Sequence, residues 1–543
     1  MTKTLRKPIS IIATVVVIAM MAFFNPAPAS AHAATLTVNS LADPGNDACD
    51  DTECTLREAI NVAASGDTIT FDPSLAGGTL ILTATLKIDK DLTLDGSNLK
   101  TPLALSGNHN VTVLYISYKS TASILNLDII DGQCGQDCIA GGINNEGVLN
   151  IHDSTIANNI ATWGAGIYNA GTLTLTNVTL SDNKTINFDI TCAACGLGGG
   201  IFNSGALVIT GSTFFGNVST RNGGGGIYNK GDLSITQTTF DDNDAAGYRD
   251  TNRFITGYGG GIYNTSRASV SASTFSGNNT YEPGNGSGIA NLGTLRVINS
   301  TFANNITRKL GAGIYNGPGG TLTVDNDTFS GNVTYNGEYY GGGLYNDRGT
   351  VYLFNAILAN SNARSDCYNF SGVIIHVHNL ITTNGPGSHA CGPELLAVDP
   401  LLGPLADNGG PTMTFALLPG SPAIDAGDND TCSKADQRGV LRFQNGFCDI
   451  GAFELSEYTI SGDVGVAGVR VSYLDGSSKA VISDNNGNYS FSVGENWSGT
   501  VMPVKAGYTF SPVNRSYGAI QSDQTGQNYV PTSITVRTQA IAE

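Results

Sequence analysis

The chain has 543 residues, of which 69 are glycine and only 13% are charged, and its formal net charge is −18. That length is too great for one ordinary compact core, although a solenoid can grow by adding coils. The negative charge, without any visible basic patch, argues against nucleic acid as a partner, because phosphate binding needs clustered positive charge.

Residues 1–33 have the pattern of a secretory signal peptide. Three basic residues precede an apolar core from Ile11 to Phe24, and small residues at 29–33 offer a cleavage site. No second long apolar run follows, so we expect a mature chain without a transmembrane helix, either secreted or held at the cell surface. The alternative is a membrane anchor that is never cut.

Because we expect the chain to be exported, we expect its ten cysteines to form disulfides. No metal or cofactor is expected. Sequence does not set their connectivity, so pairing by proximity is a working hypothesis. The pairs are Cys49 with Cys54, Cys134 with Cys138, Cys192 with Cys195, Cys367 with Cys391, and Cys432 with Cys448. The alternatives are a zinc site built from the second and third pairs, which lie about 10 Å apart in a stack of strands, and a redox role for the third pair alone.

Residues 34–66 predict an N-terminal cap with one short helix. Thr55 is a candidate N-cap, and Glu58 completes a capping box three residues later. An apolar face follows at helical spacing, and Gly66 is the expected stop. Such a helix can cover the open apolar end of a solenoid.

Residues 67–398 contain the main structural signal, a repeated unit. Short alternating runs such as Ile124–Leu127 predict about three irregular coils, and eight regular repeats follow. Each repeat joins a Gly-Gly-Gly-Ile-Tyr-Asn half, as at 224–229, to an apolar-x-x-Asn half, mostly with a period of 24 to 30 residues. A propeller blade needs about 40 to 45 residues, so the period favours an all-β fold, a right-handed parallel β-helix.

The repeats predict two ladders of stacked asparagine side chains, while their glycines permit positive φ at corners. The first ladder is Asn145, Asn169, Asn203, Asn229, Asn264, Asn291, Asn316 and Asn346. The second is Asn159, Asn183, Asn217, Asn243, Asn278, Asn305, Asn332 and Asn360.

These motifs carry a family resemblance. The repeats resemble those of polymorphic outer membrane proteins and pectin-lyase-like β-helices. Residues 54–59 resemble the Cys-Ser-Leu-Arg-Glu-Ala domain of exported bacterial proteins, with Thr55 in place of the usual serine. Residues 399–454, with Asp-Asn-Gly-Gly-Pro-Thr at 407–412 and Asp-Ile-Gly-Ala-Phe-Glu at 449–454, are similar to the choice-of-anchor module of surface proteins. The resemblance implies an exported surface protein.

Residues 457–530 look like a small β-sandwich of the transthyretin or immunoglobulin-like kind. Alternating strands separated by Asn-Gly turns support this independently. Residues 531–543 are expected to form a frayed tail.

No catalytic constellation is visible. The Asp241-Asp242 pair is the only adjacent acidic pair within the repeats, and a solvated turn explains it. Asp425, Asp428 and Asp430 have a spacing that suits calcium ligands, yet they lie in a module whose pattern sets turns, so no metal site is assigned.

The insertions between repeats carry the candidate binding residues. In a solenoid such insertions leave on one edge, and aromatic rings with Arg suit a binding face. The alternative is that the rings only cover their own loops; Phe188, Arg221 and Arg308 lie in the same loops. The candidates are Trp163, Tyr248, Arg249, Arg253, Phe254, Tyr258, Tyr281, Tyr335, Tyr339 and Tyr340.

Together these features indicate adhesion, or binding of glycans or envelope components, without catalysis. One alternative is a polysaccharide lyase or glycoside hydrolase on the same scaffold, since fold alone does not decide chemistry. Another is a passive structural spacer.

Overall fold

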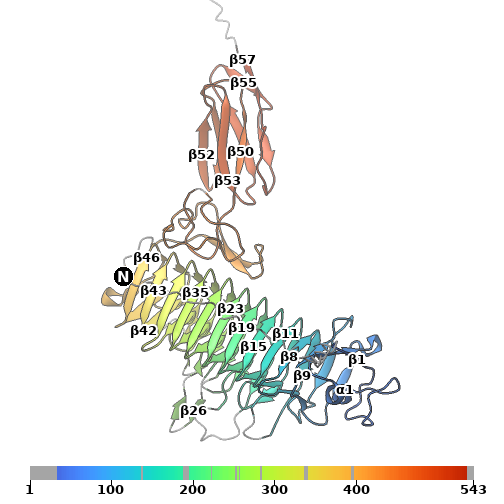
Figure 1. Ribbon diagram of the computed structural model, residues 1–543. Helices are drawn as coiled ribbons and strands as arrows, with labels where there is room; N and C mark the ends of the chain where they lie inside the picture. The colour runs from blue at the N-terminus through green and yellow to red at the C-terminus, as the bar shows by residue number, and fades with distance from the viewer. Residues whose placement is uncertain are drawn as a thin grey trace, which may run out of the picture.

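The computed structural model describes residues 33–135, 139–186, 195–221, 223–246, 248–250, 253–255, 257–281, 284–335, 340–392, 397–444 and 446–534. It confirms a right-handed parallel β-helix of about 11 turns followed by antiparallel sheets (Figure 1). Each regular coil contributes one strand in turn to four sheets, which we call C, A, B and D. The strands of every sheet pair in parallel with those of the next coil.

Sheet C is built from the Ile-Tyr-Asn half of each repeat, and sheet A from the alternating run that follows it. Sheet C consists of β4 (Leu86–Ile88), β7 (Leu114–Ile116), β10 (Ile143–Asn145), β14 (Ile167–Asn169), β18 (Ile201–Asn203), β22 (Ile227–Asn229), β29 (Ile262–Asn264), β34 (Ile289–Asn291), β38 (Ile314–Asn316), β42 (Leu344–Asp347) and β45 (Cys367–Phe370). Sheet A consists of β1 (Thr35–Val38), β2 (Asp67–Phe71), β5 (Leu92–Asp95), β8 (Thr121–Leu125), β11 (Val148–His152), β15 (Thr172–Thr176), β19 (Ala206–Thr210), β23 (Asp232–Thr236), β30 (Arg267–Ser271), β35 (Thr294–Ile298), β39 (Thr321–Asp325), β43 (Thr350–Phe354) and β46 (Val373–Val377).

Sheet B holds the Thr-Phe half of each repeat, and the short sheet D follows the second asparagine. Sheet B consists of β3 (Thr79–Ile81), β6 (Leu103–Ser106), β9 (Leu127–Ile130), β12 (Thr155–Ala157), β16 (Thr179–Ser181), β20 (Thr213–Phe215), β24 (Thr239–Asp241), β31 (Thr274–Ser276), β36 (Thr301–Ala303), β40 (Thr328–Ser330), β44 (Ile357–Ala359) and β47 (Leu380–Ile381). Sheet D consists of β13 (Ile160–Ala161), β17 (Lys184–Thr185), β21 (Val218–Ser219), β25 (Asp244–Ala245), β32 (Asn279–Thr280), β37 (Ile306–Thr307) and β41 (Val333–Thr334).

The glycine triplet has two separate roles. Gly224 has φ +72°, which only glycine adopts freely. Gly225 and Gly226 instead allow the backbones of adjacent coils to lie close together. A Cβ on Gly226 would lie 2.6 Å from the carbonyl oxygen of Gly261 in the next coil. The coils therefore stack backbone to backbone at this corner.

Both asparagine ladders form inside the solenoid. In the first, each Nδ2 donates to the Oδ1 of the next asparagine, and the chain of bonds continues past Asn346 to Asn369. In the second, the same bonds run from Asn159 to Asn332. Every member from Asn145 to Asn346, and from Asn159 to Asn332, is fully buried.

The predicted end of the second ladder at Asn360 is wrong by one residue. Strand β44 pairs with β40 so that Leu358, not Ile357, lies opposite Phe329. The ladder position is thus taken by Ser361, while Asn360 is exposed and left-handed, with φ +56°. Ile357 and Leu358 are both apolar, and only Ile357 is followed three residues later by an asparagine, so the apolar-x-x-Asn pattern selected the wrong register. Residues Ile124–Leu127 are also not one strand, because Asn126 (φ +51°) separates β8 from β9.

Replacing Asn360 by glycine is expected to change the free energy of unfolding by no more than about 0.5 kcal/mol, because glycine adopts this φ without strain. The matched change Asn332→Gly removes a buried ladder amide and is expected to cost at least about 2 kcal/mol. Urea denaturation of both variants measures the difference, and equal costs would contradict the register of β44 against β40.

The apolar core is a column of side chains between the sheets. Its central part is a stack of five phenylalanine rings from neighbouring sheet B strands, with centroids 4.5–4.8 Å apart and nearly parallel planes. They are Phe214, Phe240, Phe275, Phe302 and Phe329. Alternation along each sheet A strand completes the core, as Leu173 and Leu175 point inward while their threonine neighbours do not.

The predicted helix, α1 (Leu56–Val62), closes the N-terminal end. Thr55 and Glu58 form the expected capping box, and the helix ends at C-cap Ala63 rather than at Gly66. Its apolar face is buried in the solenoid core. Arg57 ties the helix to the preceding loop through a bond of 2.6 Å from Nε to Oδ1 of Asp43. Short 3-10 segments lie at Pro73–Leu75 and at Gly387–His389.

Residues 399–454 pack along the flank of the solenoid instead of extending it (Figure 1). Among its described residues the module holds the antiparallel pair β48 (Leu402–Ala406) and β49 (Thr414–Leu417) and an isolated bridge between Ala435 and Leu441. It binds two in-register rows of the solenoid. The first is the corner row Asn299, Asn326 and Asn355, whose outward amides bond the module backbone or its side chains. The second is the sheet B row Thr274, Thr301 and Thr328.

A buried ion network holds the module together. Arg442 donates from Nη1 to Oε2 of Glu454 at 3.0 Å, with both side chains almost fully buried. Its Nη2 also reaches Oδ1 of Asn299 in the solenoid at 2.9 Å. Burial, with the neighbouring Glu454, raises the pKa of Asp449 to about 7. The module is therefore joined to the solenoid through an internally paired charge cluster.

Residues 457–533 form antiparallel sheets consistent with the predicted sandwich. The strands are β50 (Glu457–Asp463), β51 (Arg470–Asp475), β52 (Ser477–Ile482), β53 (Asn488–Gly494), β54 (Gly499–Val504), β55 (Tyr508–Ser511), β56 (Arg515–Tyr517) and β57 (Val530–Ser533). They enclose a separate core that includes Trp497 and Phe491. Over the described residues, no helix has the length and apolar character to cross a membrane.

Three of the five predicted disulfides are confirmed. They join Cys49 to Cys54, Cys367 to Cys391 and Cys432 to Cys448. Cys134 and Cys195 are also disulfide-bonded, while Cys138 and Cys192, the partners predicted for them, lie outside the described residues.

Candidate functional site

The ten predicted binding residues fall into several places. Tyr248 lies on β26 (Tyr248–Asp250) with Arg249, and Phe254 on β27 (Arg253–Ile255) with Arg253; the two strands form an antiparallel hairpin away from the solenoid body (Figure 1). The side chains of that hairpin, and all of Tyr339, lie outside the described part of the chain. Trp163 is half-buried and pairs with Ile139 and Leu197 in successive coils.

Two of the candidates, Tyr258 and Tyr340, pack on an aromatic stripe along sheet C. The stripe is formed by outward residues of the sheet C strands from β14 to β45: Tyr168, Phe202, Tyr228, Tyr263, Tyr315, Tyr345 and Tyr368. At Ala290 the stripe lacks a ring, and Tyr258 fills the gap, 5.1 Å from Tyr263 and 6.1 Å from Tyr315. Tyr340 lies 4.4 Å from Tyr368. These two rings therefore cover the scaffold, and a binding role for them stays a prediction.

The remaining candidates, Tyr281 and Tyr335, are exposed and form a row with the half-buried Arg308. Each follows directly after a sheet D residue, and those residues, Thr280, Thr307 and Thr334, are in register. Tyr281 is 41% exposed and Tyr335 is 38% exposed. The Arg308 guanidinium lies 4.7 Å from the centre of the Tyr335 ring, a cation–π distance. We call these three residues the sheet D row.

The row was only partly found from sequence. Each member is the third residue after a second-ladder asparagine: Tyr281 after Asn278, Arg308 after Asn305, and Tyr335 after Asn332. Counting from the ladder therefore selects Arg308, which lies in the same loops but is not among the ten candidates. Strand spacing places neighbouring members about 4.8 Å apart.

An acidic group lies behind one end of the row. Tyr281 donates from its hydroxyl to Oδ2 of Asp244 in a long bond of 3.5 Å. Burial, with the nearby Asp242 carboxylate, raises the pKa of Asp244 to about 6. The Asp244 charge in turn raises the pKa of Tyr281, and Arg308 opposes that shift. Asp242 lies at an exposed turn, where its φ is +55°. Its pKa is raised, first by partial burial of the carboxyl group and second by the charge of the adjacent Asp241.

Replacing Asp244 by asparagine is expected to flatten the pH dependence of stability between about pH 4 and pH 6. The folded-state pKa of Asp244 is raised above its ordinary value of 3.8, so the folded chain holds the proton more tightly than the unfolded chain. Its contribution to the free energy of unfolding is therefore full below pH 4 and is lost as pH rises through 6. Urea denaturation across this range measures the slope.

The control for that series is Asp232→Asn, since the Asp232 carboxylate is 72% exposed on sheet A. This variant is expected to keep the wild-type slope. An Asp244→Asn slope equal to that of the wild type would contradict the assigned pKa shift.

Metal chemistry receives no support from the described residues, among which no group of three or more His, Cys, Asp or Glu side chains could hold an ion. In the segment considered for calcium, Asp428 instead accepts from the Asp430 amide at 3.1 Å and from the Thr431 hydroxyl. Half of the alternative cysteine zinc site lies outside the described chain.

Comparison with known proteins does not identify a function for the candidate site. No family model and no curated protein matches the chain. The crystal structure of pectate lyase Pel9A is similar to 78% of this chain and 96% of its own, with 14% sequence identity and a TM-score of 0.39. A likeness of that degree says nothing about the chemistry of this chain.

Proposed function

We propose that the protein is an exported surface protein that binds a polysaccharide through the sheet D row without cleaving it. The observation that carries this proposal is that Tyr281, Arg308 and Tyr335 each follow an in-register residue of sheet D, with both tyrosines exposed and the half-buried Arg308 stacked on Tyr335. Tyrosine faces stack on the apolar faces of sugar rings, and the planar guanidinium donates to hydroxyls or carboxylates. Because the three residues follow strands of a rigid stack, their spacing is set before any ligand arrives.

The net charge limits the ligand. A chain with a charge of −18 repels densely anionic polymers over its whole surface, and Arg308 supplies the row's one positive charge. A neutral or sparsely charged polysaccharide, of the envelope or its surroundings, therefore fits best.

Export is part of the same proposal. It is supported by the signal-like residues 1–33 and by the disulfides, which persist in oxidising compartments. The resemblance to Cys-Ser-Leu-Arg-Glu-Ala and choice-of-anchor surface proteins, and to polymorphic outer membrane protein repeats, points the same way.

One observation favours a second candidate, a glycoside hydrolase or polysaccharide lyase. Asp244 lies next to the row, and burial with the nearby Asp242 raises its pKa to about 6, which favours the protonated form that a general acid requires. A passive spacer is the third possibility.

A panel of pectin, alginate, cellulose, chitin and peptidoglycan tests all three. Each polymer is scored for retention of the full chain and for release of reducing ends or unsaturated products. Retention without cleavage is the expected result. Cleavage at catalytic rates that Asp244→Asn abolishes would establish the enzyme instead, and a lack of retention on every polymer would leave the spacer.

A further inference from the structure

The side chain of Asp67 occupies a core position near the N-terminal end of the solenoid. Asp67 opens strand β2 and is only 7% exposed, on the same inward side as Ile69 and Phe71. Strand pairing puts it opposite Leu92 of β5, and every later strand of sheet A, as far as Ile374 in β46, holds an apolar residue at this position. A carboxylate in such a column is costly unless hydrogen bonds or an opposite charge compensate it.

The two oxygens of this carboxylate bind two separate parts of the chain. Oδ1 accepts from the backbone nitrogen of Ala34 at 2.8 Å. Oδ2 accepts from the backbone nitrogen of Ala64, just after helix α1, also at 2.8 Å. The carbonyl oxygen of Ala34 accepts in turn from the Thr68 amide at 2.9 Å. Ala34, the residue before β1, is therefore fixed at both its nitrogen and its oxygen.

Side-chain cations do not compensate the charge of Asp67. Within the described part of the chain, no ion pair includes this carboxylate. Lys90 lies at the end of helix α1, and its Nζ donates to three backbone carbonyls there. The neighbouring Asp91 adds a second negative charge and accepts from the Thr121 amide. Of the groups that contact Asp67, the nitrogen of Ala34 is one that can become positively charged.

Ala34 is also the residue that follows one of the two possible ends of the leader sequence. A pattern of the Ala-x-Ala kind precedes the cut made by signal peptidases. Ala31 and Ala33 satisfy this pattern for a cut between Ala33 and Ala34, and Ala29 and Ala31 satisfy it for a cut after Ala31. The pattern alone does not choose between the two.

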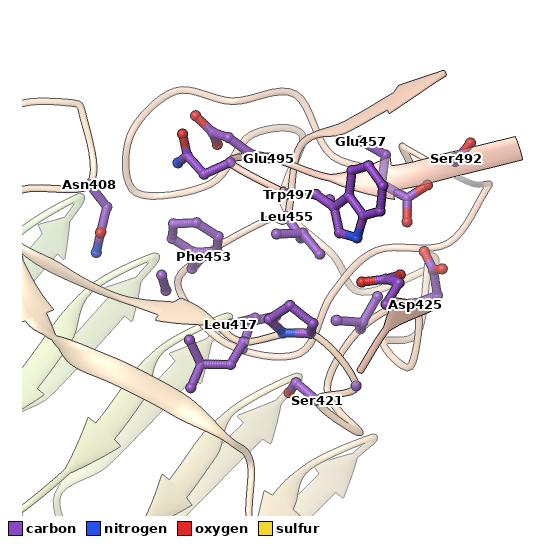
Figure 2. A pocket seen from close by; sticks show the side chains of 18 of the residues that line it. Asn408, Leu417, Ser421, Asp425, Phe453, Leu455, Glu457, Ser492, Glu495 and Trp497 are labelled. Carbon is purple, nitrogen blue, oxygen red and sulfur yellow. The ribbon is translucent and has the colours of Figure 1, made fainter. Parts of the chain in front are cut away.

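Buried carboxylates elsewhere in the chain show the two arrangements that are open to Asp67. Asp436 pairs with Arg438 at 2.9 Å, in the wall of the cavity between the module of residues 399–454 and the sandwich (Figure 2). Asp366 accepts from backbone amides, and its burial raises its pKa. A positive charge on Ala34 gives Asp67 the first arrangement, that of a paired charge.

We infer that the leader is cut between Ala33 and Ala34, and that the new α-ammonium group of Ala34 forms an ion pair with the buried Asp67. The inference rests on the export that is part of the proposed function. Hydrolysis of this peptide bond by a signal peptidase consumes one water and leaves a carboxylate on Ala33 and an amine on Ala34, which takes up a proton at neutral pH. A cut after Ala31 leaves the same nitrogen as a neutral amide.

The ion pair has a structural consequence. The existing bond of 2.8 Å becomes charge-assisted, and such bonds are roughly twice as strong as neutral ones. Strand β1 is the edge strand of sheet A and pairs with β2 alone. Removal of the leader therefore fixes the first strand of the solenoid against the second, beside the helix that covers this end.

Mass spectrometry of the full chain, after export from a bacterial host, tests the site of the cut. Ala34 is the expected first residue. A mature chain that begins at His32, or an exported chain that keeps its leader, would overturn the inference.

Two forms of the mature chain test the ion pair, one with a free amine on Ala34 and one with Ala34 N-acetylated. Acetylation keeps the N–H donor and removes the charge, and is expected to quicken hydrogen exchange of the β1 amides by about tenfold. Asp67→Asn is expected to remove that difference between the two forms. The control is Asp89→Asn, since the Asp89 carboxylate is 52% exposed, and this variant is expected to alter the difference by less than about twofold.

Equal β1 exchange in the free and acetylated forms of the unsubstituted chain would overturn the ion pair, even if Asp67→Asn does not fold. Both forms are expected to be retained equally on the polysaccharide panel, because the sheet D row lies in later coils. Loss of retention in both forms would therefore count against the proposed function alone.

Discussion

Replacing Phe275 by alanine is expected to lower the free energy of unfolding by about 4 kcal/mol. Phe275 is fully buried at the centre of the phenylalanine stack, 4.7 Å from Phe240 and 4.8 Å from Phe302. The change removes the burial of the ring, its two stacking contacts and the packing of the column, and the backbone of the flanking coils is too tightly stacked to close the cavity. Urea denaturation measures the loss.

The control for this change is Phe215→Ala on the outer face of the same sheet. Phe215 is 43% exposed, so its removal is expected to cost less than about 1 kcal/mol. Similar costs for the two variants would contradict a core organised around the stack.

Replacing Asn229 by alanine is expected to cost about 3 kcal/mol. The Asn229 amide donates to Oδ1 of Asn264 at 2.8 Å and to the carbonyls of Gly231 and Arg267, each at 3.0 Å. Its own oxygen accepts from Asn203 at 2.8 Å. Alanine leaves the fully buried amides of Asn203 and Asn264 with one partner fewer, and no water can replace it there.

Because each coil contacts only its neighbours, the effect of Asn229→Ala is expected to be local. Hydrogen exchange is expected to quicken first in β22 and β29. Asn61→Ala, at an exposed position of helix α1, is expected to change neither stability nor exchange in those strands. Uniform faster exchange over the whole solenoid would contradict the nearest-neighbour account.

The repeat was readable from sequence because one physical unit, the coil, imposes one period on glycine, asparagine and the core residues together. Register was harder to predict. At Ile357 and Leu358 two apolar residues stand side by side, and only strand pairing decides which one is buried opposite Phe329. The same limit hid the break at Asn126, which looks like one polar residue within an apolar run.

Contacts between distant segments could not be predicted from sequence. Asn299, Asn326 and Asn355 read as ordinary turn residues, and their outward amides acquire a role only when residues 399–454 lie on them.

The candidate site could be predicted from sequence only in part. Tyr281 and Tyr335 were selected as aromatic loop residues, but that criterion also selected Tyr258 and Tyr340, which pack on the sheet C stripe. Aromatic character alone does not separate a ring that covers the scaffold from one that faces solvent. The count from the ladder asparagine does, because it reports which coil position each residue occupies.

The most direct test of the account is the affinity of the sheet D row for the polysaccharide that the panel retains best. Calorimetric titration with a soluble fragment compares the wild type, Tyr281→Ala/Tyr335→Ala and Tyr118→Ala, whose ring is 72% exposed away from the row. We predict that the double variant binds at least about tenfold more weakly, at unchanged thermal stability, and that Tyr118→Ala binds within twofold of the wild type. Wild-type affinity in a folded double variant would contradict the account.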